Sequence, residues 1–322
     1  MIAPIEKAAA LLRAGELVAF PTETVYGLGA DAGNPTAVAK IFAAKGRPAD
    51  HPLIVHLPGD DHLERWARDI PDAAYELAEA FWPGPLTLIL KRQSGVIDAV
   101  TGGQDTVGVR VPGHPLALEL LRAFGGGVAA PSANRFGRIS PTTAQHVRDD
   151  LGDAVAMVLD GGACSVGIES TIVDVSSGRS RILRPGMISA VDLGRVLGRM
   201  PPVGGSPSGE HLPRVSGSLE SHYAPRTPLL LAQPDVLIFA VRDALAKNER
   251  LAVLAPMACP ISDSRIVWCQ APSEPAAFAR DLYANLRALD AAGCSRIVVQ
   301  KPPQSDGWQA VNDRLRRAAA SA

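Results

Sequence analysis

A proline- and glycine-rich segment near residue 200 sets the strongest limit on how this chain can fold. The run Pro201-Pro202-Val203-Gly204-Gly205-Ser206-Pro207-Ser208-Gly209 holds three prolines and three glycines. Ordering glycine costs much backbone entropy, and proline lacks the N–H group that regular pairing needs. This run therefore cannot belong to a core. In a chain of 322 residues, which is long enough for two cores, we expect domains at 1–199 and 229–322 joined by a linker at 200–228.

Helical and strand patterns alternate on both sides of the linker. Asn34-Pro35 combines an N-cap with a proline at the first helical position, which predicts a helix over 35–44. The first domain is also predicted to contain helices at 5–13, 115–124 and 142–151, and strands at 17–20, 53–57, 86–91, 107–111, 128–130, 156–159, 171–175 and 181–183. Because some strands are separated by helices and others by short turns, we predict an α+β fold with a mixed sheet.

The second domain has mostly apolar strand patterns. The expected strands are 229–232, 251–256, 266–269 and 297–300, and the expected helices are 275–291 and 308–319. Strands of this apolar kind are typical of a sheet that is covered on both faces. We therefore predict a small α/β layer domain.

Composition excludes several classes of protein. Lys and Arg number 32 against 33 Asp and Glu, so broad, non-specific binding of nucleic acid is not expected and any polyanion site should be local. The 4 cysteines form no C-x-x-C pair, which argues against a zinc site or disulfide framework and fits a reducing compartment. Residues 1–10 carry Glu6 and Lys7 and show no apolar core of signal-peptide length, and no apolar run approaches the length of a membrane span. We expect a cytoplasmic protein without a membrane partner.

The segment 45–56 concentrates charge at the mouth of an apolar strand. It carries Lys45, Arg47, His51 and His56. The dipole at a helix C-terminus accounts for Lys45 and partly for Arg47, but not for a histidine inside an apolar strand. Arginine offers a rigid bidentate fork and lysine a mobile point charge, and both suit phosphate and carboxylate groups. The cluster predicts an anion site.

Other segments offer polar groups at strand ends. Ser132 and Asn134 follow the predicted strand 128–130, and Arg110 interrupts an apolar strand. A buried guanidinium is costly without a fixed anion, so Arg110 needs a partner, which is either an acid of the fold or a substrate carboxylate. The segment 21–30 contains a Gly-x-Gly, but the following helix opens too late for a dinucleotide fingerprint. Residue types alone favour a glycine-rich turn there, and no P-loop motif occurs.

Together these motifs resemble a known family. The segments that carry the resemblance are Pro21–Ala30, Lys45–His56, Phe81–Thr87, Val107–Pro112, Pro131–Asn134, Gly167–Asp174 and His222–Pro225. They are similar to the YrdC-like family, specifically to threonylcarbamoyl-AMP synthases in their long, two-domain form. The resemblance implies a twisted mixed β-sheet with a concave basic face and packed helices, followed by a smaller Rossmann-like α/β domain. It also implies a nucleotidyltransferase: L-threonine, bicarbonate and ATP give threonylcarbamoyl-AMP and pyrophosphate, the first step of tRNA threonylcarbamoyladenosine formation.

The resemblance also assigns roles to residues. It implies Lys45 and Arg47 as catalytic residues; Thr24, His56, Arg110 and Ser170 as threonine contacts; and Arg47, His51, Ser132, Asn134, Ser140, Arg184 and Tyr223 as nucleotide contacts. Mg²⁺ would arrive on the ATP phosphates, with its protein ligands unknown, and the product would pass to a downstream threonylcarbamoyl transfer complex, so tRNA is only an indirect partner. His51 replaces the asparagine of many members. Tyr223 and the linker are expected to form a lid that excludes water from the intermediate.

Two other functions compete with this one. An RNA-binding module without ATP chemistry would use the basic face directly on tRNA or double-stranded RNA, although near-zero net charge and few aromatic residues weigh against it. Carbamoyl transfer in hydrogenase maturation employs a related domain, but the chain lacks the cysteine-rich zinc modules expected beside it.

Overall fold

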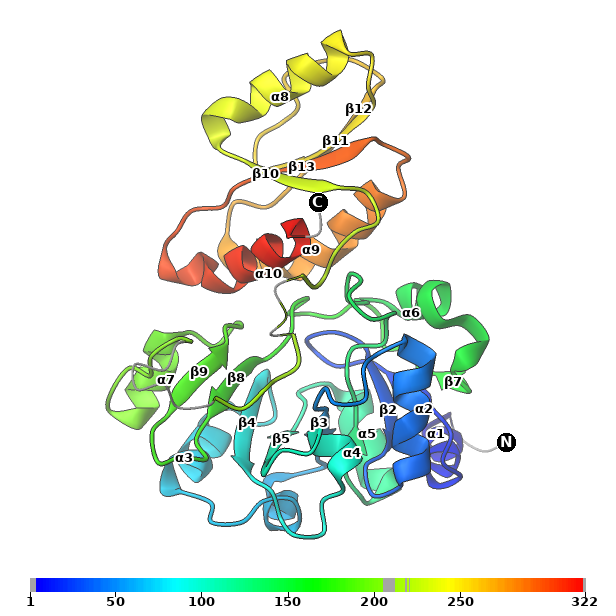
Figure 1. The fold of residues 1–322 in the computed structure, drawn as a ribbon, viewed down its shortest axis with the longest axis vertical. Helices are drawn as coiled ribbons and strands as arrows, with labels where there is room; N and C mark the ends of the chain where they lie inside the picture. Colours follow the sequence, from blue (N-terminus) through cyan, green and yellow to red (C-terminus); the bar gives the residue numbers. More distant parts are fainter. Residues whose placement is uncertain (1–3, 205–211, 218, 220, 321–322) are drawn as a thin grey trace. The chain divides into compact units, whose positions relative to one another are not determined.

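The computed structural model describes residues 4–204, 212–217, 219 and 221–320. The chain divides into two compact units (Figure 1). Unit 1 comprises Met1–Phe136 and Pro141–Ser218, and unit 2 comprises Gly137–Ser140 and Leu219–Ala322. The later division falls inside the predicted linker, of which residues 205–211, 218 and 220 lie outside the described residues. The domain limits at 199 and 229 stay a prediction.

Unit 1 is built on a mixed sheet that has nine strands in the described ranges. In spatial order they are β7 (Met157–Val158), β1 (Val18–Phe20), β2 (Gly27–Asp31), β6 (Val128–Ala129), β3 (Ile54–His56), β5 (Thr106–Arg110), β4 (Leu86–Lys91), β8 (Thr171–Asp174) and β9 (Arg181–Arg184). β3 runs parallel to β5, whereas β4 runs antiparallel to β5 and parallel to β8. The predicted mixed sheet is confirmed.

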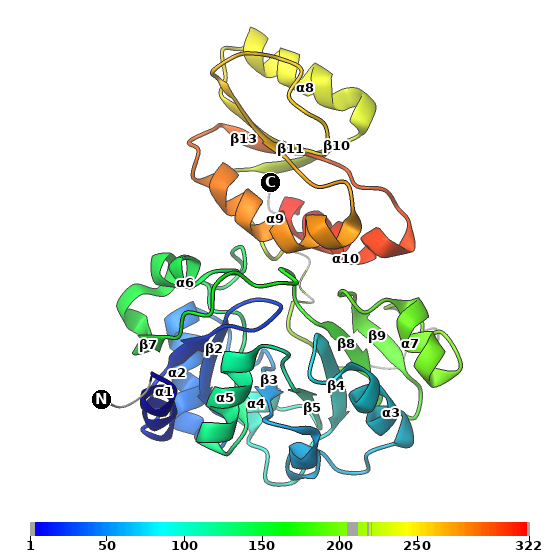
Figure 2. The same cartoon turned by 180° about the vertical axis from the view of Figure 1, so that it is seen from behind.

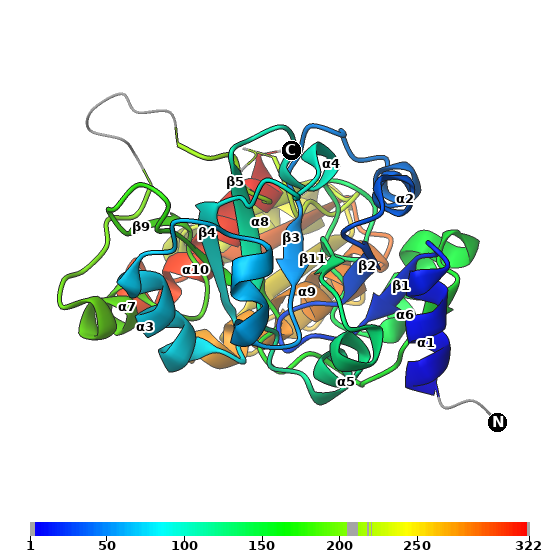
Figure 3. The same ribbon diagram turned by 90° about the horizontal axis from the view of Figure 1, so that it is seen from below.

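The helices of unit 1 cover two faces of this sheet. They are α1 (Pro4–Arg13), α2 (Pro35–Lys45), α3 (Asp72–Phe81), α4 (Asp98–Thr101), α5 (Pro115–Phe124), α6 (Ala144–Leu151) and α7 (Ala190–Leu197), with 3-10 turns η1 (Asp60–Arg65) and η2 (Gly152–Ala154). α1 lies beside α5, and α3 beside α7 (Figures 2 and 3). Because strand side chains alternate between faces, Phe20 packs with α1 and α5 while Ala19 packs in the larger cluster with α2 and α3. The predicted helix 35–44 begins as expected, with the Asn34 side chain accepting N–H bonds from Thr36 and Ala37.

The segment 21–30 corrects one prediction. We expected a glycine-rich turn, but Gly27–Asp31 forms β2, antiparallel to β1. A side chain at Gly29 would place its Cβ 2.8 Å from Val128 Cγ1 and 2.9 Å from Phe20 Cε1. Glycine is therefore present because neighbouring side chains fill that space, since a strand glycine often marks such a close approach.

Unit 2 is a small layered α/β domain, as predicted. Its sheet runs β10 (Leu229–Ala232), β13 (Arg296–Gln300), β11 (Leu251–Ala255) and β12 (Ile266–Gln270), with every pairing parallel. The helices are α8 (Pro234–Ala246), α9 (Pro275–Asp290) and α10 (Gln309–Ala319), with a 3-10 turn η3 (Asp306–Trp308). α8 covers one face of the sheet, and α9 and α10 cover the other (Figures 1 and 2). None of the helices in the described ranges is both long and apolar enough to cross a membrane.

Candidate active site

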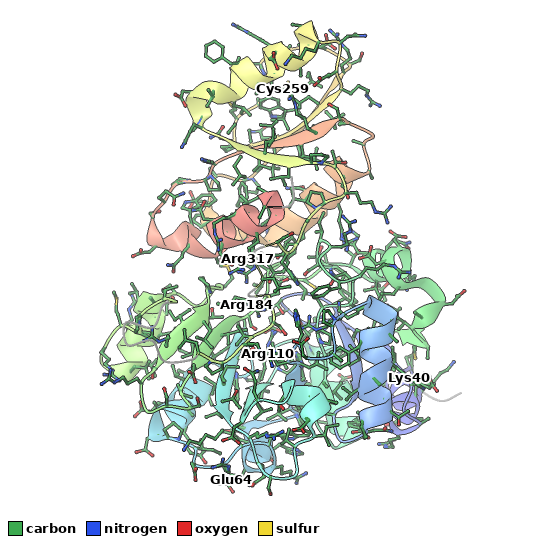
Figure 4. The ribbon with its side chains drawn as sticks, viewed as in Figure 1. Lys40, Glu64, Arg110, Arg184, Cys259 and Arg317 are labelled. Carbon is green, nitrogen blue, oxygen red and sulfur yellow. The ribbon has the colours of Figure 1, made fainter. Side chains whose placement is uncertain are left out.

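One face of the central strands of unit 1 gathers the polar residues. Strand pairing sets His56 of β3 opposite Arg110 of β5, and Ile172 of β8 opposite Arg184 of β9. Ile54 and His56 lie two residues apart and so point to the same face. Arg110 and Arg184 are labelled among these strands in Figure 4. An apolar floor beside these polar groups is formed by Ile54, Ile89 and Ile172.

Arg110 is buried and held by three contacts. Its Nε donates to Gly84 O at 3.1 Å, one terminal nitrogen donates to Thr24 Oγ1 at 3.0 Å, and the other meets Glu23 Oε1 at 2.5 Å. Glu23 is therefore the fixed anion that a buried guanidinium requires. A guanidinium has five N–H donors, so two remain without a partner among the described residues and can receive a substrate carboxylate.

Glu23 is a site residue that sequence reasoning missed. Its second oxygen, Oε2, accepts the N–H of Gly113 at 2.9 Å, so both carboxylate oxygens are fixed. Thr22 and Thr24 flank it, and their hydroxyls lie 2.8 Å apart. The sequence order Pro21-Thr22-Glu23-Thr24 places an acid between two hydroxyl residues, which is a weak signal because it does not name a partner for the acid.

His56 is buried next to Arg110 and is neutral. Its ring meets Phe20 edge-on at a centroid distance of 5.8 Å. Burial, with the Arg110 charge as the second cause, lowers the pKa of His56 from 6.5 to about 3. A neutral imidazole carries one donor and one acceptor nitrogen, so His56 can bind a hydroxyl or amine without repelling a cation.

Ser170 and Arg184 form a second polar group. The Ser170 hydroxyl lies 2.8 Å from that of Thr87 and accepts from Arg184 at 3.1 Å. Arg184 also donates to the Ser170 carbonyl, at 2.9 and 3.1 Å, and through its other terminal nitrogen to Ser216 O at 2.9 Å. Thus Arg184, at the end of β9, binds Ser170, which directly precedes β8.

Lys45 is the last residue of α2, and its ammonium points at backbone oxygen atoms. It donates to the carbonyls of Ser132 and Asn134. Burial, and next the Arg47 charge, lower the pKa of Lys45 well below 10.5. Two of its three N–H donors therefore tie the end of α2 to the loop that carries Ser132 and Asn134, which are two of the predicted nucleotide contacts.

Arg47 and His51 share an aromatic neighbour. Arg47 lies over the ring of Phe136 at 5.7 Å, and the His51 ring is 5.4 Å from the same ring. Arg47 also donates to Pro52 O at 3.0 Å and to Ser216 Oγ at 3.2 Å. Burial, and next Arg47, lower the pKa of His51 from 6.5.

The linker residues Arg214–Ser216 cross this face of the sheet. Val215 packs on Ile54, Ile89 and Ile172, while Ser216 accepts from Arg47 and Arg184. The space left beneath these linker residues is about 10 Å³, near the smallest volume that holds one water, about 10–15 Å³. In this arrangement the linker occupies the guanidinium donors that a phosphate would need.

The structure brings ten of the twelve predicted site residues together in unit 1 and places two, Ser140 and Tyr223, in unit 2. The ten are Thr24, Lys45, Arg47, His51, His56, Arg110, Ser132, Asn134, Ser170 and Arg184. In the described ranges no cluster of three or more His, Cys, Asp or Glu side chains could hold a metal ion. The arrangement is suited to binding two anions side by side.

Comparison with known proteins identifies the family. A family model described as telomere recombination matches residues 10–186, and one described as the C-terminal domain of threonylcarbamoyl-AMP synthase matches residues 187–320. The threonylcarbamoyl-AMP synthase of Bacillus subtilis is 39% identical over 320 residues, which is 98% of this chain and 92% of the relative. The chain belongs to the threonylcarbamoyl-AMP synthase family.

Other members of the threonylcarbamoyl-AMP synthase family agree in length and fold. The Schizosaccharomyces pombe member is 35% identical, in an alignment that covers 98% of this chain and 88% of that relative. The crystal structure of Pyrococcus abyssi Sua5 complexed with L-threonine superposes with a TM-score of 0.88 at 37% identity, covering 98% of this chain and 94% of that one. The family resemblance seen in the sequence is confirmed, and so is the two-part fold.

Proposed function

We propose that this protein is an L-threonylcarbamoyladenylate synthase, which converts L-threonine, bicarbonate and ATP into threonylcarbamoyl-AMP and pyrophosphate. The supporting observation is the sheet face that sets the buried Arg110, His56 and Ser170 beside the arginines Arg47 and Arg184. Membership of the family fixes the reaction type. This reaction is the first step of tRNA threonylcarbamoyladenosine formation, and its product passes to a downstream transfer complex, so tRNA is an indirect partner.

The threonine end of the site binds its substrate through one guanidinium and several neutral polar groups. The two available N–H groups of Arg110 receive the threonine carboxylate, and the hydroxyls of Thr24 and Ser170 with the neutral His56 bind its amine and hydroxyl. The amine attacks CO₂ derived from bicarbonate and loses a proton, which leaves a carbamate. Holding both reactants in place supplies much of the acceleration of such a step.

The nucleotide end accepts the second anion. A carbamate oxygen attacks the α-phosphorus of ATP, the new O–P bond forms, and the bond to the β-phosphate oxygen breaks to release pyrophosphate. Arg47 and Arg184 neutralise the phosphates, and Lys45 offers its third N–H while holding the loop of Ser132 and Asn134. His51 lies next to Arg47 as a further nucleotide contact. Mg²⁺ bound through the ATP phosphates would add charge neutralisation, as in other phosphoryl-transfer sites.

The linker acts as the lid of this site. With Ser216 on Arg47 and Arg184, the linker must leave the sheet before phosphates bind. Its return over the nucleotide would shield the hydrolysable intermediate from water. Tyr223 lies within the predicted linker and is, together with Ser140, an expected nucleotide contact. We place the reaction in the cytoplasm.

Pyrophosphate release tests the function. The purified full-length protein should release pyrophosphate from ATP only when threonine and bicarbonate are both present. Arg47→Ala should lower turnover by roughly ten- to a hundredfold, since a charge-assisted hydrogen bond is worth about 1.5–3 kcal/mol. Arg195→Ala is the matched control, because that side chain is 74% exposed on α7. Release that does not depend on threonine would overturn the proposal, and steeply salt-dependent RNA binding without ATP consumption would favour the RNA-binding alternative.

A further inference from the structure

A four-residue loop of the first family match belongs structurally to the second unit. Gly137–Ser140 lies within residues 10–186 of that match, yet it is part of unit 2. Its last residue, Ser140, is one of the proposed nucleotide contacts.

Side chains and backbone of unit 2 bind the loop at each end. The Arg287 guanidinium, from α9, donates to the carbonyls of Ile139 and Ser140, the latter at 3.3 Å. At the other end, Ala224 N–H donates to Gly137 O at 2.9 Å, and Arg138 donates to Pro225 O at 3.2 Å. The loop is thus paired with the segment that follows Tyr223.

Tyr223 is held by α9 and also by α10. Its ring stacks on Tyr283 of α9 at 5.7 Å, and Arg314 of α10 lies 5.3 Å from its centre. The preceding residue, His222, donates its N–H to the carbonyl of Arg317, at 3.3 Å; Figure 4 labels Arg317 on α10. Tyr223 has φ of 62°, a left-handed conformation that costs a non-glycine residue energy and persists only where neighbours enforce it.

We propose that Arg287 is a positioning residue for ATP binding, through which α9 sets the place of Ser140. This inference rests on the proposed function, because it takes Ser140 and Tyr223 as nucleotide contacts. Two residues 83 positions apart, Ser140 and Tyr223, are ordered by one helix, α9, through Arg287 and Tyr283. Arg287 itself need not touch the substrate.

Steady-state kinetics of the full-length protein test the inference. Arg287→Ala should raise the KM for ATP by about tenfold, the size expected for losing a charge-assisted hydrogen bond, and leave the KM for threonine within about twofold. The KM for ATP of Arg287→Lys should lie between those of the parent and of Arg287→Ala, because an ammonium can still donate to a carbonyl but lacks the planar fork. Arg280→Ala, on the same helix, is the matched control, since Arg280 is 51% exposed and pairs with Asp281.

Two further variants separate this inference from the proposed function. Ser140→Ala and Tyr223→Phe should each raise the KM for ATP. If these two variants raise the KM for ATP and neither Arg287 variant does, the positioning role of Arg287 is wrong while the proposed function stands. If none of the four changes the KM for ATP, the nucleotide assignment itself fails. A general loss of structure would raise both KM values and lower the melting temperature, and if Arg287→Ala does not fold, Arg287→Lys decides.

Discussion

At the scale of single residues, the buried pair of Glu23 and Arg110 explains how an arginine is tolerated inside an apolar strand. Both side chains are nearly inaccessible, with 10% and 5% of their surfaces exposed. Removing one partner of a buried pair leaves the other charge without compensation, which is more costly than the net value of the pair. The threonine carboxylate would meet the same guanidinium, so protein acid and substrate acid share one cation.

This sharing leads to a prediction for Glu23→Gln. The amide keeps the shape and the acceptor for Gly113 N–H but removes the charge, so the free energy of unfolding should fall by about 3 kcal/mol. L-Threonine should then raise the melting temperature of the variant more than that of the parent, because its carboxylate replaces the missing charge. Thermal unfolding with and without threonine measures both effects.

Asp98→Asn is the matched control for this experiment. It also removes a carboxylate from an arginine pair, but Asp98 is 76% exposed, and exposed pairs contribute about 0–1 kcal/mol. Equal threonine-induced shifts in Glu23→Gln and the parent would mean that the substrate carboxylate does not meet Arg110.

At the scale of helices and strands, the sequence predicts elements that carry their own local signals. The helix 35–44 has a capping asparagine and a proline, and it begins where predicted. The helices α3, α4, α7 and α8 were not predicted. The prediction of a turn over 21–30 was wrong because the glycines of β2 resemble turn residues locally, whereas Gly29 is required by the close approach of Phe20 and Val128. Patterns within one segment are visible in a sequence, and contacts between segments are not.

The same distinction applies to the candidate site. Positions such as His56 and Arg110 could be found because a charged or titratable side chain contradicts an apolar strand. Glu23 lies between β1 and β2, and only the folded chain brings it to Arg110 of β5. Likewise, nothing in the local sequence indicates that Lys45 donates to the carbonyls of Ser132 and Asn134. The sequence therefore shows which residues need partners, and the fold supplies the partners.

The linker gives a prediction at this scale. Val215→Ser removes apolar contacts with Ile54, Ile89 and Ile172, which should weaken the seating of the linker by about 1–2 kcal/mol. Ser216 should then leave Arg47 and Arg184 more often, so the apparent dissociation constant of ATP should fall several-fold. Equilibrium binding of ATP measures this. Val203→Ser, at a linker position that is 41% exposed, should leave it unchanged, and a weaker affinity in Val215→Ser would contradict the blocking role of the linker.

At the scale of the whole molecule, acid stability should depend on His56. The folded-state pKa of His56 is about 3, because burial and then Arg110 disfavour the charged ring, against 6.5 in an exposed chain. As pH falls below 6.5, the unfolded chain takes up a proton that the folded protein refuses. The free energy of unfolding therefore decreases between pH 6.5 and 3, by up to about 1.4 kcal/mol per pH unit from this group.

His56→Gln tests this dependence, because glutamine keeps a donor and an acceptor but does not titrate. Urea unfolding of the parent and the variant at pH 7.5 fixes the difference that arises from packing alone, since the imidazole is neutral in both states there. On going to pH 4.5, the parent should lose about 2–3 kcal/mol more than the variant, from two pH units of linkage. Stability curves that stay parallel from pH 7.5 to 4.5 would show that the ring takes up its proton equally in the folded and unfolded states. A neutral His56 beside the threonine site would then have to be abandoned.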